Sequence, residues 1–108
     1  MQNIFDNLPD GADEEELTDL LKRPGVHIER IVSTGQASPP GFWYDQAHDE
    51  WVILLSGAAG LLVEGEAEQR LTPGDYLFLP AHTRHRVTLT AKDEPTVWLA
   101  VHVGEARA

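Results

Sequence analysis

The chain has 108 residues, no cysteine and a formal net charge of −10, from 18 acidic and 8 basic side chains. This length suits one domain, the absence of cysteine excludes disulfides and thiolate metal sites, and the acidic field opposes binding to nucleic acid. Because no apolar run approaches a membrane span and the N-terminus lacks a secretory signal, we expect a cytoplasmic protein with no membrane or nucleic-acid partner.

The first segment, residues 1–24, is acidic and differs in pattern from the rest. Its stretch "DGADEEELTDLLKRPG" begins with turn-forming and acidic residues and ends in Lys-Arg-Pro-Gly, which is typical of helix start and stop signals. Leu17, Leu20 and Leu21 follow the i, i+3, i+4 spacing of one apolar stripe. We expect a short helix packed on the domain. A flexible acidic tail is the alternative, because so short a helix is marginal without packing.

From Val26 onward the apolar residues alternate with a period of two, which is typical of β-strands. Clusters of Gly and Pro separate the runs, which suits antiparallel hairpins and leaves no space for crossover helices. The sequence therefore predicts an all-β sandwich or barrel of six or seven strands over residues 25–105. The predicted runs are 26–32, 50–55, 59–71 (two short runs), 75–80, 86–90 and 96–103.

Two stretches resemble the motifs of the cupin family. "EWVILLSG", from Glu50 to Gly57, is similar to the end of the first motif, in which six residues separate an acidic residue from a glycine. "GDYLFLPAHTRH", from Gly74 to His85, is similar to the second motif, with glycine, proline and histidine in order. Further stretches resemble small single-domain bacterial cupins of largely unassigned function, so that the resemblance covers most of the chain. It implies a jelly-roll β-barrel, often dimeric, with a site in the barrel mouth.

The resemblance also implies a metal site of three histidines and one carboxylate, which this chain matches only in part. Glu50 and His85 occupy two of the four positions. Tyr44 and Gln46 stand where the first two histidines are expected, or Trp43 and Asp45 if the spacing is one residue longer. Neither register supplies two imidazoles.

Neighbouring residues offer an alternative set of metal ligands. If residues 44–50 run as one strand, every second side chain from Tyr44 to Glu50 shares a face, which would place His48 beside Glu50. Arg84 and Arg86 flank His85, so the same period turns the histidine inward. A mixed nitrogen and oxygen set suits a divalent ion such as Zn, Fe, Mn, Ni or Cu. The predicted metal ligands are His48, Glu50, His82 and His85.

Other polar groups are candidates for binding a small molecule. Tyr44 and Gln46 are poor metal ligands but good hydrogen-bond partners, and His102 on the last strand is a further candidate. Alternatives remain for two histidines: a hairpin or bulge would leave His48 on the surface, and His82 could hold its turn by hydrogen bonding. We interpret His27 as an ordinary strand histidine.

Three functions are consistent with these observations. The first is a cupin that binds a small polar molecule through a divalent metal, with or without catalysis. The second is a metal-free cupin that binds or senses a small ligand, and the third is a structural or interaction module. The sequence contains no nucleophile elbow, phosphate loop or dinucleotide fingerprint. We also expect a homodimer, because exposed strand edges must be paired, covered or charged.

Overall fold

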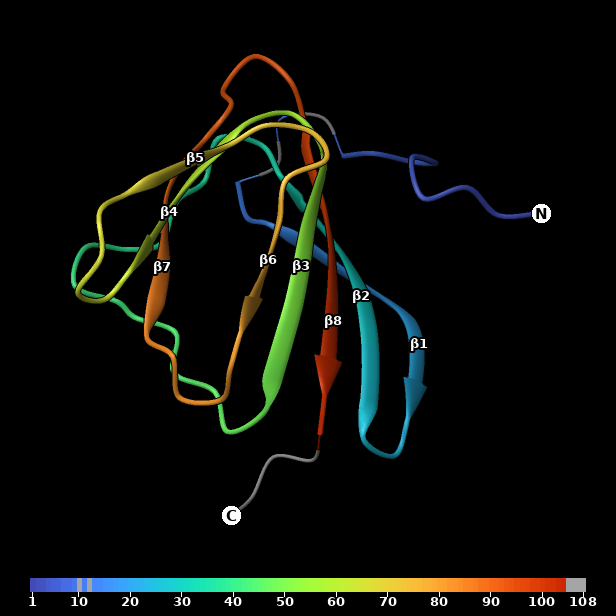
Figure 1. Cartoon of the computed structure of the whole chain (residues 1–108). Coiled ribbons are helices and arrows are strands. Elements are labelled where there is room, and N and C mark those ends of the chain that lie inside the picture. The colour runs from blue at the N-terminus through green and yellow to red at the C-terminus, as the bar shows by residue number, and fades with distance from the viewer. Residues whose placement is uncertain (10, 12, 105–108) are drawn as a thin grey trace.

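The computed structural model describes residues 1–9, 11 and 13–104, which form two antiparallel sheets that face each other (Figure 1). One sheet has the strand order β1-β2-β8-β3-β6 and the other has the order β5-β4-β7. The fold is therefore all-β, as predicted, and it has the jelly-roll architecture. The strands are β1 (Glu16–Arg23), β2 (Val26–Ser33), β3 (Asp49–Ser56), β4 (Ala59–Val63), β5 (Gln69–Leu71), β6 (Tyr76–Leu79), β7 (His85–Thr90) and β8 (Thr96–Val103).

The predicted N-terminal helix is wrong, because its residues form the edge strand β1. This strand pairs with β2 from Glu16↔Val32 to Arg23↔Val26, with a bulge between Asp19 and Leu21. The Pro-Gly pair that we interpreted as a helix stop instead connects β1 to β2, and Gly25 has the positive φ of 75° that such a turn requires. Residues 16–23 are thus part of the larger sheet of the barrel. Residues 10, 12 and 105, which the predicted segments include, lie outside the described residues.

The core lies between the two sheets, which Figure 1 shows facing each other. Trp98 is its largest member, and the indole Nε1–H donates a hydrogen bond to Ser33 Oγ at 3.3 Å. Burying such side chains contributes roughly 1.5–3 kcal/mol each. The buried core residues are Val52, Leu54, Ala59, Leu61, Leu71, Leu79, Trp98 and Ala100.

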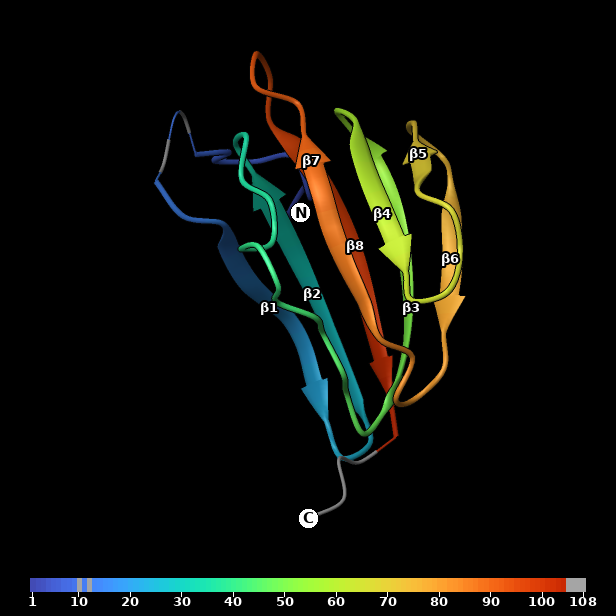
Figure 2. The ribbon, with the colours of Figure 1, turned by 90° about the vertical axis from the view of Figure 1, so that its left-hand side faces the viewer.

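The smaller sheet is extended by the connection from β2 to β3, which crosses in front of β2 in Figure 2. Tyr44 forms an isolated antiparallel bridge with His85 at the start of β7. Ser38 N–H donates to the Val87 carbonyl at 2.9 Å, so two points of this connection are fixed beside β7. It therefore places side chains over the part of the large sheet that β4, β5 and β7 leave uncovered.

The N-terminal residues are attached to the outer face of the large sheet through Arg30. Its guanidinium donates to the carbonyls of Ile4 and Asp6, at 3.0 and 2.6 Å, and to the Glu16 carboxylate at 2.7 Å. These contacts account for an arginine that is only 7% exposed. Across the described ranges, no helical segment has the length and hydropathy of a membrane span.

Candidate functional site

A cavity of about 130 Å³ lies between the sheets, at the end where polar residues replace the core. Among the residues that the structure describes, no lysine or arginine lines it, although three carboxylates do, so that the local field favours cations and hydrogen-bond donors. The apolar lining is Leu17, Ile31, Val52, Leu61, Leu79, Val87 and Trp98. The polar lining is Glu15, Glu29, Tyr44, Gln46, Glu50, His85 and His102.

Glu50 on β3 and His85 on β7 face each other across the cavity. His85 Nε2 is 3.8 Å from Glu50 Oε1, beyond hydrogen-bond distance. His85 Nδ1 lies 2.9 Å from the Thr83 carbonyl oxygen. Because a carbonyl only accepts, Nδ1 carries a proton, and in the neutral ring Nε2 is then an acceptor on the side of Glu50. The pair therefore offers an imidazole acceptor and a carboxyl group on either side of a space that one polar atom of a ligand can bridge.

Burial raises the pKa of Glu50, and the nearby Glu29 charge acts in the same direction. His102 and His85 oppose this effect, but burial is the larger cause. Glu50 therefore holds a proton more readily than an exposed glutamate. A carboxyl of this kind can donate a hydrogen bond when protonated and accept one when ionised.

Tyr44 and Gln46 reach the cavity from the connection that precedes β3. The Tyr44 ring stacks on the His85 ring, with 5.4 Å between centroids. Burial, together with the charges of Glu15 and Glu50, raises the pKa of Tyr44, so its hydroxyl stays neutral and can donate. The Gln46 carbonyl accepts the backbone N–H of His82 at 2.6 Å, which fixes the backbone beside the cavity.

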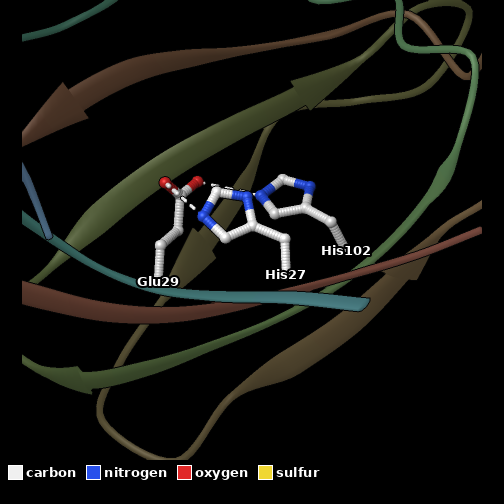
Figure 3. A group of neighbouring side chains, drawn as sticks. All are labelled: His27, Glu29 and His102. Carbon is white, nitrogen blue, oxygen red and sulfur yellow. Dashed lines mark hydrogen bonds and ion pairs between the residues drawn. The ribbon is translucent and has the colours of Figure 1, made fainter. Parts of the chain in front are cut away.

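His102 on β8 has polar neighbours on both adjacent strands. Its Cα partners are His27 on β2 and Glu50 on β3, so one row crosses the sheet through these three residues. Figure 3 shows the contact between His102 and Glu29, in which Nε2 lies 2.8 Å from Oε1. On the other side of the ring, His102 Nδ1 lies 2.8 Å from His48 Nε2. The hydrogen bond to Glu29 raises the pKa of His102.

His48 and His82 do not join the other predicted metal ligands. The expectation of one strand over residues 44–50 is wrong, because β3 begins at Asp49. His48 consequently lies beside His102 in a second hollow and does not line the cavity. Burial and the neighbouring histidines lower the pKa of His48.

The His82 side chain is exposed on its turn. Nδ1 lies 2.9 Å from Asp45 Oδ1, the side chain is 69% exposed, and the backbone has a φ of 62°. This placement matches the alternative in which His82 holds the turn. The four predicted ligands are therefore not brought together: Glu50 and His85 share the cavity, whereas His48 and His82 lie outside it.

The family's metal position does not fit a metal in this chain. Of its four groups, Tyr44 and Gln46 replace imidazoles, which leaves one imidazole and one carboxyl group whose nearest atoms are 3.8 Å apart. A phenol that keeps its proton and a neutral amide are weak ligands for the borderline metals. An ion at that position would therefore lack the ligands that it needs.

Three residues of the polar region were not predicted from the sequence. Glu15 and Glu29 line the cavity, and His27 lies beside Glu29. His27 and Glu29 are two positions apart in the alternating run "VHIER", so a shared face was visible. Their proximity to His102 was not visible, because it depends on the pairing of β2 with β8.

Comparison with known proteins supports the architecture. Residues 30–102 match the model of the cupin domain. A solved structure from Ralstonia eutropha JMP134, with the provisional name mannose-6-phosphate isomerase, shares 55% identity with a TM-score of 0.94, covering 97% of this chain and 98% of that one.

More distant solved structures share the fold alone. The polyketide cyclase RemF from Streptomyces resistomycificus is 18% identical, with a TM-score of 0.73 and coverage of 94% of this chain and 72% of that one. An RmlC-like cupin from Methanocaldococcus jannaschii is 15% identical, with a TM-score of 0.70 and coverage of 90% and 86%. No curated protein matches the sequence.

Proposed function

Since the chain belongs to the cupin domain family, we propose that it binds a small polar molecule in the cavity between its sheets. The observation that carries this proposal is the pair of Glu50 and His85, held 3.8 Å apart in a cavity that combines apolar walls with further polar side chains. Binding sites of this kind combine apolar walls with a few polar groups that orient the ligand.

The polar groups define the chemistry of the ligand. His85 Nε2 accepts a hydrogen bond, and Glu50 accepts or donates according to its protonation. Tyr44 and Gln46 add two groups on the side of the β2–β3 connection. An amino group between Glu50 and His85 can donate to both, and a hydroxyl can donate to His85 while it accepts from protonated Glu50. The cavity, at about 130 Å³, is smaller than the 300–1,000 Å³ typical of drug-sized ligands, so the ligand is small.

A sugar phosphate, the class named for the Ralstonia eutropha protein, is a weaker candidate for this chain. Phosphate sites use lysine, arginine, a metal or the N-terminus of a helix. The described lining offers Glu15, Glu29 and Glu50 and neither of the two basic residue types. The carboxylates of Glu15 and Glu29, joined by Glu50 when it is ionised, repel a dianion. We therefore propose a neutral or cationic ligand, bound without chemistry or with proton transfer at Glu50 and His85.

The test is a thermal-shift screen of small polyols, amines and amino alcohols, with sugar phosphates in parallel. A ligand present at 100 times its Kd adds about 2.7 kcal/mol, which raises the Tm of a domain of this size by about 10 °C or more. The screen is run in a chelator, so that no metal contributes. We expect neutral or cationic compounds to shift the wild type and sugar phosphates to leave it unchanged.

Matched variants then locate the binding. Glu50→Gln and His85→Ala should weaken a hit about tenfold or more, because the first replaces the carboxyl group by a neutral amide and the second removes the imidazole. His82→Ala is the control, because it removes a histidine that points to solvent outside the cavity. Equal binding by all four proteins would contradict the proposal, and so would a preference for sugar phosphates.

A further inference from the structure

We propose that His27, Glu29 and His102 form a binding site for one divalent transition-metal ion, displaced from the position that the cupin motifs occupy. The inference goes beyond the proposed function and does not depend on it. An ion at this site would be held by β2 and β8, whereas the motif residues Glu50 and His85 lie on β3 and β7.

The geometry suits one ion between the three side chains. Each side chain offers one ligand atom, and these atoms lie within 4.8 Å of one another. The Glu29 carboxylate faces both rings in Figure 3, with Oε1 at 2.8 Å from His102 Nε2 and Oε2 at 4.0 Å from His27 Nε2. Metal–ligand bonds of 2.0–2.2 Å in a tetrahedral site place ligand atoms about 3.4 Å apart. Rotation about the terminal side-chain bonds, whose energy wells are broad, closes the remaining difference.

The strands hold two of these residues side by side. His27 and His102 are directly paired in the antiparallel register of β2 and β8, and their rings stack with centroids 5.4 Å apart. Glu29 is two positions along β2 and therefore on the same face. Side chains on paired strands are positioned more rigidly than side chains on loops, which favours a preformed site.

A second observation is the group of partners around the two histidines. His102 Nδ1 lies 2.8 Å from His48 Nε2. With an ion on Nε2, His102 would donate its Nδ1–H to His48, which is the outer-shell contact that orients most metal-bound histidines. Asp19 Oδ1 lies 2.6 Å from His27 Nε2 on the exposed side, where this carboxylate could become the fourth ligand.

The site is open to solvent and lies beside the cavity. A solvent-open hollow of about 340 Å³ is bordered by His27, Glu29, His48 and His102. Glu29 and His102 also line the cavity, so an ion between them would form part of its polar end.

The donor set identifies the class of ion. Two imidazoles and one carboxylate favour Zn²⁺ and the neighbouring first-row ions over Ca²⁺ and Mg²⁺, which take oxygen ligands. These three protein ligands leave a fourth coordination position, which Asp19, water or a ligand atom could fill.

The test is titration of chelator-treated, tag-free protein with Zn²⁺ by calorimetry and with Co²⁺ by visible absorption. We expect one equivalent of either ion to bind the wild type, with the Co²⁺ spectrum reporting imidazole ligation. His27→Ala and Glu29→Gln should weaken binding about 100-fold, because each removes one of three ligands. His48→Gln should weaken it about tenfold with the stoichiometry unchanged, because it alters only the partner of His102.

Two histidine variants are the controls. His82→Ala removes an exposed histidine, and His85→Ala removes the histidine of the cupin motif; both should bind the ion as the wild type does. The absence of saturable binding would overturn the proposal. So would loss of the ion in His85→Ala with its retention in His27→Ala, which would return the site to the motif position. Binding of small molecules in chelator is measured separately, so failure of either proposal leaves the other testable.

Discussion

Gly57, the glycine of the first cupin motif, is predicted to be required by the close approach of β8 as well as by its own backbone conformation. Its φ is 85°, in the left-handed region. A Cβ at this position would lie 2.3 Å from Thr96 Oγ1 and 2.6 Å from Thr96 Cα. Gly65 has the same φ of 85° and no atom within 4 Å of its Cβ position, so it is a matched control.

The two substitutions should differ by the steric contribution alone. Gly65→Ala places a methyl group in a left-handed conformation and should lose about 1–2 kcal/mol. Gly57→Ala has the same backbone cost, and it must also displace Thr96, which adds roughly 1–3 kcal/mol as overpacking does in a core. Thr96 Oγ1 also accepts the Ala58 N–H at 3.3 Å and lies 3.2 Å from the Ala58 carbonyl, contacts that the displacement would disturb.

Urea unfolding of the two variants and the wild type measures the difference. We expect the unfolding free energy of Gly57→Ala to be lower than that of Gly65→Ala by about 1–3 kcal/mol, with similar m-values. Equal losses would refute the reasoning, because they would mean that β8 moves away freely and that only the backbone conformation requires glycine.

Three further predictions concern a buried charge, the N-terminus and the outer face. Burial raises the pKa of Glu50, so the native state loses stability as pH rises toward and through that pKa. Glu50→Gln should therefore raise the unfolding free energy at pH 7.5, by about 1.4 kcal/mol for each unit by which the pKa is raised, and give no gain near pH 4. Urea unfolding at both pH values checks this, and equal gains would contradict it. Arg30→Gln should release residues 1–9 and cost about 1–3 kcal/mol, seen as faster hydrogen exchange there, whereas unchanged exchange would oppose it. We propose a homodimer through the outer face of β3 and β6, where Tyr76 and Phe78 are 65% and 57% exposed. The Phe78→Lys variant should sediment as a monomer. A wild-type protein that already sediments as a monomer would contradict the proposed dimer.

The strands from Val26 onward were predictable because their alternation reflects burial between two sheets. β1 was not, because Leu17, Leu20 and Leu21 fit a helical stripe and are 61%, 46% and 40% exposed in the structure. An edge strand has one neighbour, so its conformation depends on pairing with β2 more than on its own pattern.

The candidate site was predictable at the positions that the cupin motifs fix, and His102 was predicted from its place on the last strand. Glu50 and His85 follow from the two cupin motifs, and both line the cavity. The proximity of His27 to His102 arises from a pairing between strands far apart in the sequence, which no local pattern encodes. His48 was misplaced because its neighbours form a connection whose course is determined by contacts with β7.

The three carboxylates of the cavity are accommodated in different ways, and this connects the two proposals. Glu15 accepts a hydrogen bond from Ser33 Oγ at 2.7 Å, and Glu29 is paired with His102 at 2.8 Å. Glu50 Oε1 lies 3.8 Å from His85 Nε2, which is beyond hydrogen-bond distance. A ligand that donates a hydrogen bond to Glu50 would therefore replace the hydrogen bonds to water that the carboxyl group loses on burial.

An ion at Glu29 would alter that balance, because His102 lies between Glu29 and Glu50 on the sheet. A positive charge so close would favour ionised Glu50 and strengthen it as an acceptor. Binding of a neutral hydrogen-bond donor and binding of the ion should therefore be coupled, with each increasing the affinity of the other by the same factor. Titrating a small-molecule hit with and without Zn²⁺ measures the factor. A value of one in the wild type would mean that the two sites are electrostatically independent despite sharing His102.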